Sequence, residues 1–198
     1  AADFQSALQE LLQETFTAHQ RIIFNGNGYD DAWVAEAARR GLANLRDTVD
    51  CMPAYIDKKN IDLFTKHAVL TETEMRARYE IHLENYCKVT AIEAHTLLDM
   101  VTRCILPAAG KYADSLAQTL FHKKNCGISL PTVMEERTLT RVSEQSAALF
   151  RVCEDLQTAL HNAPAADGGI DVARWYRAEI AARTQQAGEL INQLETIV

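Results

Sequence analysis

The side chains best suited to bind a metal ion lie between positions 80 and 99. They are Glu80, His82, Glu84, His95 and Asp99. On a helix, His95 and Asp99 would share a face because they are four residues apart. Di-metal centres in helical bundles need Glu-x-x-His motifs on two helices and two further glutamates, and this sequence contains no Glu-x-x-His. The pattern therefore favours solvated or interhelical polar contacts over a metal centre.

A second candidate site is the run Gly26-Asn27-Gly28, which precedes an expected helix at Asp30 or Asp31. Exposed backbone N–H groups at the start of a helix favour anions, so such a run could hold a phosphate. However, the strand-turn-helix context of phosphate-binding motifs is missing, and the two aspartates would repel an anion. The sequence favours a tight structural turn over a phosphate site.

Nucleophilic and redox chemistry has little support in the sequence. The five cysteines are Cys51, Cys87, Cys104, Cys126 and Cys153. No Cys-x-x-Cys pair, short Cys/His spacing or Gly-x-Ser-x-Gly turn is present. An odd number of scattered cysteines indicates reduced thiols that act mainly as small core hydrophobes, although Cys126 beside Gly127 could be exposed. We expect no catalytic, cofactor-binding or metal-binding residue in this chain.

Charge and hydropathy exclude two classes of partner. The 198 residues have a net charge of −7, and the pI is about 5.4. No basic stretch is available to neutralise phosphates, so nucleic acid is not expected as a partner. Membrane insertion is not expected either, because the longest apolar runs, such as 147–150, are far shorter than the ~20 residues of a span.

The first 70 residues have the pattern of short helices and loops. Apolar residues recur at steps of three and four from Phe4 to Ile23, which predicts an amphipathic helix ending near Phe24. A second helix is expected over 32–40, ended by Gly41 in a left-handed conformation. Residues 42–56 look irregular, and a further short helix is expected over 57–66.

From Thr71 onward the pattern predicts long helices. Thr71 and Glu74 form a capping-box signature, and helical periodicity continues to about residue 125, with a kink or interruption expected at Pro107. One buried stripe is expected to comprise Met75, Tyr79, Leu83, Tyr86, Leu97, Met100 and Cys104, with Ala91 and Ala94 between them.

Two more helices complete the expected bundle. Pro131 is expected to open a long helix whose seam is Leu139, Val142, Ser146, Leu149, Cys153, Leu156 and Leu160. Residues 162–169 are the clearest turn. The last helix should begin near Asp171, with Tyr176, Ile180, Ala187, Leu190, Ile191 and Leu194 on its buried side.

The predicted fold class is therefore all-α, because no β alternation of useful length is present. We expect a single helical domain over 1–198, in which an N-terminal part of short helices and loops (1–70) lies against a bundle of long antiparallel helices (71–198). Aromatic residues would anchor loops 25–56 on the bundle, or alternatively face a partner protein. These aromatics are Trp33, Tyr55, Phe64 and Tyr79.

Several sequence blocks, in order, resemble one family. They are HQRIIFNGNGY at 19–29, Trp33, RRGL at 39–42, DCMPAY at 50–55, LFTKH at 63–67, Thr71-Glu72, RYEIHLENY at 78–86, IEA at 92–94 and ILPAAGKY at 105–112. Together these blocks resemble the carboxyl-terminal region of type III glutamine synthetases. The helical pattern and the turn at 162–169 extend the resemblance beyond residue 112.

The resemblance implies a cytoplasmic parent enzyme that joins ammonia to the side-chain carboxylate of glutamate through a γ-glutamyl phosphate. ATP and Mg²⁺ or Mn²⁺ would serve that parent, which the resemblance places in stacked rings of identical subunits. The family's β-grasp portion, metal ligands, nucleotide contacts and glutamate-binding arginines match no position here. We therefore expect an excised helical domain without synthetase activity of its own, whose partners are the catalytic domain of the parent chain and neighbouring subunits.

Two alternatives stay open. The chain could be a free-standing helical module that recruits another protein through the same seams and aromatics. It could also be an independent metal-dependent bundle enzyme, which stoichiometric iron, manganese or zinc in the purified chain would support.

Overall fold

A computed structural model describes residues 3–197 and divides the chain into two compact units, Ala1–Asp47 and Thr48–Val198. Every regular element in the described residues is helical and none is a strand, which confirms the all-α prediction. No helix within residues 3–197 has both the length and the hydropathy that crossing a membrane requires. The predicted single domain, with its change of character near residue 70, stays a prediction.

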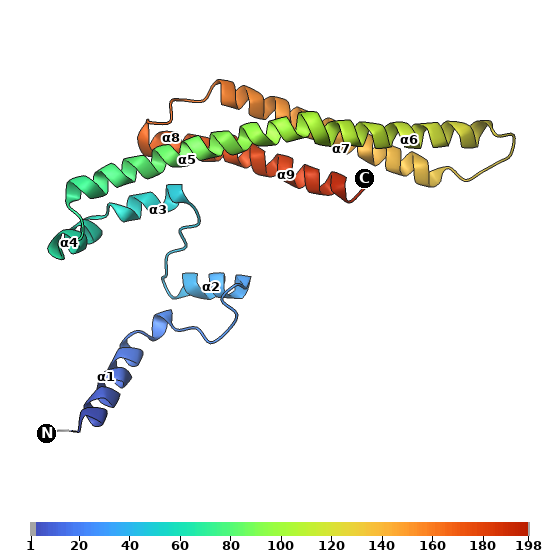
Figure 1. The fold of residues 1–198 in the computed structure, drawn as a ribbon. Coiled ribbons are helices and arrows are strands. Elements are labelled where there is room, and N and C mark those ends of the chain that lie inside the picture. The colour runs from blue at the N-terminus through green and yellow to red at the C-terminus, as the bar shows by residue number, and fades with distance from the viewer. Residues whose placement is uncertain (1–2, 198) are drawn as a thin grey trace. The chain divides into compact units, whose positions relative to one another are not determined.

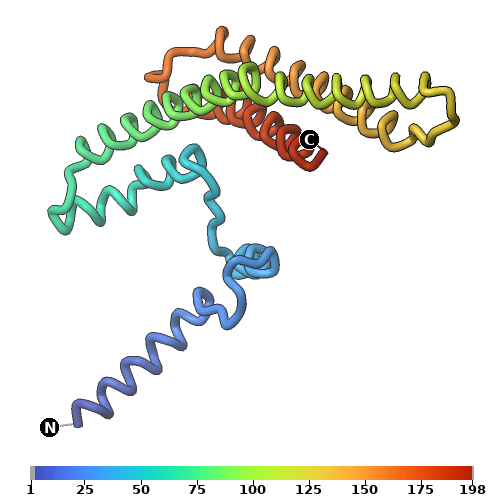
Figure 2. Tube along the Cα trace, turned by 45° about the vertical axis from the view of Figure 1, so that its right-hand side comes forward, coloured from blue at the N-terminus to red at the C-terminus, as the bar shows by residue number. Residues whose placement is uncertain are grey.

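The first unit consists of two α-helices joined by a turn. Helix α1 spans Phe4–Ala18, a 3-10 helix spans Gln20–Ile22, and α2 spans Asp31–Arg39. Figures 1 and 2 show α1 extending away from α2 within this unit. The prediction that the first α-helix continues to Phe24 is wrong, because the α-helical hydrogen bonds end at His19 and the chain tightens into the 3-10 turn.

Gly41 ends α2 as the sequence predicts. Its φ is +73°, a left-handed value that glycine adopts without the strain a Cβ would cause. The Gly41 N–H donates to Ala38 O at 3.0 Å and the Leu42 N–H donates to Ala37 O at 3.0 Å. This pair of bonds is a Schellman motif, which satisfies carbonyl groups at the end of the helix.

The second unit is a bundle of long helices preceded by two short ones. Its elements are α3 (Thr48–Tyr55), α4 (Lys58–Lys66), α5 (Glu72–Met100), a π-helix (Val101–Ile105), α6 (Leu106–Asn125), α7 (Val133–His161), α8 (Gly169–Trp175), a second π-helix (Tyr176–Ala181) and α9 (Ala182–Glu195). Figures 1 and 2 show α5 and α6 as one continuous rod, with α7 and α9 alongside it.

The prediction of irregular chain over 42–56 is wrong for α3, which forms despite Pro53 in its interior. Proline removes a helical donor and should disfavour such a helix. Tertiary contacts oppose that cost, since Val49 is buried in the same cluster as Leu83 of α5. An ion pair of 2.7 Å also joins Asp50 to Arg177 of the second π-helix.

The capping box at the start of α5 is confirmed. The Glu74 N–H donates to Thr71 Oγ1 at 3.2 Å, and the Thr71 N–H donates to the Glu74 carboxylate at 2.8 Å. The latter bond lowers the pKa of Glu74.

The interruption expected at Pro107 is present as a change of helix type, although the rod itself continues. A π turn precedes Pro107, in which the Leu106 N–H donates to Val101 O, and α6 continues directly. Two predicted starts also shift slightly: the helix expected from Pro131 begins at Val133, and the helix expected from Asp171 begins at Gly169.

The core of the second unit contains two buried clusters. The first is Val49, Leu83, Cys87, Ala94, Leu156, Ala159, Ala173, Tyr176 and Ile180. The second is Val101, Ala109, Val142, Leu149, Val152, Cys153, Ala187, Ile191 and Leu194. The predicted faces of α7 and of the last helix supply six of the nine members of the second cluster and three of the first, namely Leu156, Tyr176 and Ile180. Those two predicted faces are therefore confirmed at these positions.

The predicted buried stripe fails at its C-terminal end. Met100 is 52% exposed and Cys104 is exposed, whereas Val101 is only 1% exposed. At 3.6 residues per turn, Val101 and not Met100 follows Ala94 on the same face. Ile105, which is half-buried, packs against the second cluster where Cys104 was expected.

Candidate functional site

The structure does not assemble the predicted metal candidates into a metal site. Among the described residues, no group of three or more histidines, cysteines or carboxylates could hold a metal ion. Glu84 instead forms an ion pair with Lys88 on its own helix, and Asp99 pairs with Arg103 at 2.6 Å. This donor set in residues 3–197 does not fit a divalent cation.

Two of these candidates do line a groove between α5 and α7 of about 590 Å³. His95 and Asp99 contribute from α5, and Glu154 and His161 contribute from α7, with buried Cys153 also in the lining. Imidazoles and carboxylates around an open groove can hydrogen-bond a polar molecule. Sequence reasoning missed the two α7 residues, because only the antiparallel packing of the helices brings them opposite α5.

The cysteines divide between core and surface. Cys87 and Cys153 are buried thiols, and burial raises the pKa of both. Cys104 and Cys126 are exposed, and Cys51 is intermediate. The prediction of core hydrophobes therefore holds for the two buried residues and is wrong for Cys104.

The Gly26–Gly28 run forms a structural turn. The Asn27 side-chain oxygen accepts from the Tyr29 N–H at 3.1 Å, and the Asp30 N–H donates to Asn27 O at 3.3 Å. A Cβ on Gly26 would lie only 2.6 Å from the Phe24 ring. The Phe24 ring therefore packs close to the backbone at Gly26, and a side chain at this position would require the ring to move.

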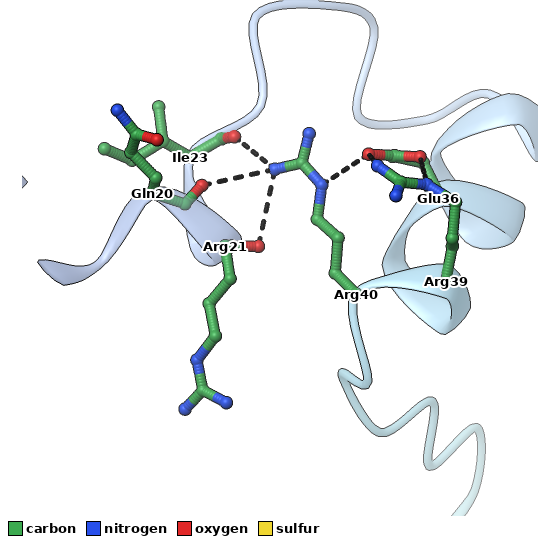
Figure 3. A network of polar contacts seen from close by, with 6 residues as sticks. All are labelled: Gln20, Arg21, Ile23, Glu36, Arg39 and Arg40. Carbon is green, nitrogen blue, oxygen red and sulfur yellow. Dashed lines mark hydrogen bonds and ion pairs between the residues drawn. The ribbon is translucent and has the colours of Figure 1, made fainter. Parts of the chain in front are cut away.

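Arg40 connects this turn region to α2 (Figure 3). Its Nη1 donates to the carbonyl oxygens of Gln20 and Arg21, each at 3.4 Å, and to that of Ile23. Its Nε donates to the Glu36 carboxylate at 2.6 Å. One guanidinium thus satisfies carbonyl groups at the end of the 3-10 helix while it pairs with a carboxylate one turn back on α2. The sequence gives no signal for this role beyond the Arg39-Arg40 pair.

Two aromatic rings flank the same guanidinium. Phe24 and Trp33 lie with their ring centroids 4.5 Å apart, and Arg40 Cζ lies 5.9 and 5.8 Å from these centroids. Hydrogen bonds from Arg39 and then Arg40 lower the pKa of Glu36 to about 2. Together these contacts join α2 to the segment 20–24 within the first unit.

An exposed apolar surface of the first unit lies along α1. No residue of α1 is buried, although the helix contains Phe4, Leu8, Leu11, Leu12 and Phe16 at helical spacing. These five residues are 41–77% exposed. Amphipathic helices normally obtain most of their stability by burying such a stripe.

A second apolar surface lies at the connection between α6 and α7. Its members are Phe121, Ile128, Leu130, Val133 and Met134, which are 40–67% exposed. In Figures 1 and 2 the connection lies beyond the end of α9. At this connection, Lys123 of α6 pairs with the carboxylate of buried Glu135 of α7, and the hydrogen bond from Lys123 lowers the pKa of Glu135.

Comparison with known proteins identifies the family. Residues 7–124, more than half of the chain, match the family described as the glutamine synthetase C-terminal domain. This chain belongs to that family. The resemblance to the C-terminal region of type III glutamine synthetases is confirmed by relatives that include a type-3 enzyme.

Three curated relatives show how much of a glutamine synthetase the chain represents. A glutamine synthetase of Butyrivibrio fibrisolvens is 33% identical over 196 residues, which are 99% of this chain and 28% of the relative. A type-3 glutamine synthetase of Dictyostelium discoideum is 31% identical over 77% of this chain and 20% of its own length. A glutamine synthetase of Bacteroides fragilis is 33% identical over 60% of this chain and 16% of its own length. The chain thus spans between 16% and 28% of the length of these relatives.

Proposed function

We propose that this chain is the helical, non-catalytic domain of a type III glutamine synthetase, and that it serves subunit packing. The supporting observation is the family match over residues 7–124. In addition, 99% of this chain aligns with a relative that is more than three times as long. The parent would ligate ammonia to glutamate with ATP and Mg²⁺ or Mn²⁺ in the cytoplasm. Residues 1–198 would form one C-terminal domain that contributes no catalytic or cofactor-binding residue.

Two apolar surfaces support a packing role. The α1 stripe and the α6–α7 connection each expose five large apolar side chains. Exposed clusters of this kind are typical of surfaces that another protein or another part of the same protein covers. The catalytic portion of the parent and neighbouring subunits of a homo-oligomer are the partners that we propose.

An activity assay tests the catalytic half of the proposal. The complete protein should form glutamine from glutamate, ammonia and ATP in the presence of Mg²⁺ or Mn²⁺, whereas the 198-residue chain should form none. Turnover by the 198-residue chain would show that catalytic groups lie within it. A complete protein without ATP-dependent glutamine formation would refute the assignment as a ligase.

Assembly tests the packing half. Met134 is 67% exposed, so Met134→Asp places a charge on the α6–α7 surface without disturbing the core. The substitution should lower the mass of the assembled complete protein in analytical ultracentrifugation. Thr119→Asp, at an exposed α6 position, is the control and should leave the mass unchanged. Equal masses for the unsubstituted protein and both variants would show that the α6–α7 surface does not take part in subunit packing.

A further inference from the structure

The turn ahead of α2 contains two asparagines that are each followed by glycine, Asn25-Gly26 and Asn27-Gly28. No other asparagine of the sequence precedes a glycine. The backbone nitrogen of the next residue can attack an asparagine side chain, because the two groups close a five-membered ring. Placing the reacting groups on adjacent residues makes this step intramolecular and therefore faster. Glycine favours the reaction, since it has no Cβ to obstruct the nitrogen and adopts many backbone conformations.

The structure polarises the side-chain carbonyl group of Asn27. The Tyr29 N–H donates to Asn27 Oδ1 at 3.1 Å. Attack on the side-chain carbon places negative charge on this oxygen, and a hydrogen-bond donor already directed at it lowers the barrier. A Cβ added to Gly28 would meet no atom within 4 Å, so the backbone around the attacking nitrogen has room to rotate. Asn27 and Gly28 are both exposed, which admits water for the later hydrolysis.

Asn25 has less favourable surroundings for the same reaction. A Cβ on Gly26 would lie 2.6 Å from the Phe24 ring. That ring is itself packed against Trp33, with the two ring centroids 4.5 Å apart. The Phe24 ring therefore opposes the backbone rotation that cyclisation at Asn25 needs. Among the residues that the structure describes, no donor equivalent to the Tyr29 N–H contacts the Asn25 side chain.

We infer that Asn27 is a site of spontaneous deamidation, for which the turn itself supplies both reacting groups. The Gly28 nitrogen forms a bond to Asn27 Cγ, and the bond from Cγ to the side-chain nitrogen breaks. Ammonia leaves with the proton of the Gly28 N–H, and a cyclic imide remains. Water then opens the imide at either carbonyl group, which restores the N–H and gives aspartate or isoaspartate. The net reaction consumes water and releases ammonia, and it needs no other reactant.

Either product changes the turn. A carboxylate at position 27 adds negative charge close in sequence to Asp30 and Asp31, at the start of α2. In isoaspartate the main chain passes through the side-chain carbon, which adds a methylene group. The Asn27 carbonyl oxygen that accepts from the Asp30 N–H at 3.3 Å then belongs to a free carboxylate. Deamidation therefore changes both the charge and the course of the turn that precedes α2.

Mass spectrometry of the complete protein tests the inference. The folded protein is held at mildly alkaline pH, where the Gly28 amide proton is lost more easily, and is then digested at acidic pH. Each deamidation adds about 1 Da, because an amide becomes a carboxylic acid, and fragmentation distinguishes Asn27 from Asn25. Conversion at Asn27 should be at least about fivefold faster than at Asn25. Conversion that is equal or faster at Asn25, or absent at Asn27, would overturn the inference.

The unfolded protein shows whether the structure or the local sequence sets the preference. In guanidinium chloride neither Asn-Gly pair keeps its native contacts, so the two rates should agree within about twofold. A preference for Asn27 of the same size in the folded and unfolded protein would contradict the roles of the Tyr29 donor and the Phe24 ring. The product at position 27 should include isoaspartate as well as aspartate. Aspartate alone would indicate direct hydrolysis and would overturn the cyclic intermediate.

Substitutions assign the reacting groups. Gly28→Ala places a Cβ beside the attacking nitrogen in open space, and it should slow conversion at Asn27 by at least about tenfold. Conversion at Asn25 in the same variant is the internal control and should not change. Asn27→Gln should abolish the faster phase of the mass gain, because the longer side chain does not close a five-membered ring, whereas Asn25→Gln should preserve that phase. A faster phase that persists in Asn27→Gln would overturn the inference.

Discussion

Val101 and Met100 provide the sharpest test of the packing described for the second unit. Both are apolar neighbours near the end of α5, yet Val101 is 1% exposed and Met100 is 52% exposed. Val101 belongs to the second buried cluster, together with Leu149 and Ile191. Truncating each residue to alanine should therefore give very different losses of stability.

The expected magnitudes follow from burial. Val101→Ala removes two buried methyl groups at about 0.8 kcal/mol each and leaves a small cavity, for a total of about 2 kcal/mol. Met100→Ala removes a larger side chain, but half of it is already in water and alanine favours the helix, so we expect about 0.5 kcal/mol or less.

Urea unfolding followed by circular dichroism measures both variants. With an m-value of about 2 kcal/mol per M, Val101→Ala should lower the midpoint by about 1 M and Met100→Ala by about 0.25 M or less. The m-values should stay equal to that of the unsubstituted chain. A midpoint shift for Met100→Ala that matches or exceeds that of Val101→Ala would show that the buried stripe follows Met100 and Cys104 after all.

Three further predictions concern local features. Ala68 has a left-handed φ of 51° at the end of α4, so Ala68→Gly should stabilise the chain by about 1 kcal/mol in urea unfolding, and a loss of stability would contradict this. Arg39 and Arg40 lower the pKa of Glu36 to about 2 from a model-peptide value near 4.5, so its stabilising effect should be complete above about pH 4.5 and disappear as pH falls through about 2. Carbon-13 NMR of the Glu36 carboxyl group should show this low titration midpoint, and the midpoint should rise in the Arg40→Ala variant. An unchanged midpoint in that variant would show that Arg40 does not lower the pKa of Glu36. Buried Cys87 should react with a thiol reagent only on unfolding, whereas exposed Cys126 should react at once, and similar rates would contradict the packing of α5.

Part of the fold could be predicted because it depends on local rules. The Thr71–Glu74 capping box and the Gly41 helix end each involve a few adjacent residues whose side chains or φ values select one conformation. The α7 seam repeats over several heptads, so its buried face is defined within a single helix. The ordered sequence blocks between residues 19 and 112 likewise indicate the family without reference to tertiary contacts.

Other features were decided by contacts between segments distant in sequence. Helix α3 forms although it contains Pro53, because Val49 packs against α5 and Asp50 pairs with Arg177. The groove between α5 and α7 likewise brings together side chains from two helices. The sequence pattern of a single helix does not specify which residues of another helix lie next to it.

The end of α5 is a place where the sequence alone does not predict which residues are buried. Two apolar stripes run side by side along that helix, one through Met100 and one through Val101. The residue types do not show which of the two is buried. The amino-acid sequence by itself determined that helices form, where most begin and end, and to which family they belong, because propensity, capping and periodicity act over a few residues. Only the tertiary structure decided which of these two stripes is buried, and which other apolar stripe, such as that of α1, stays exposed. The reason is that burial depends on a neighbouring helix contributed by a distant part of the chain.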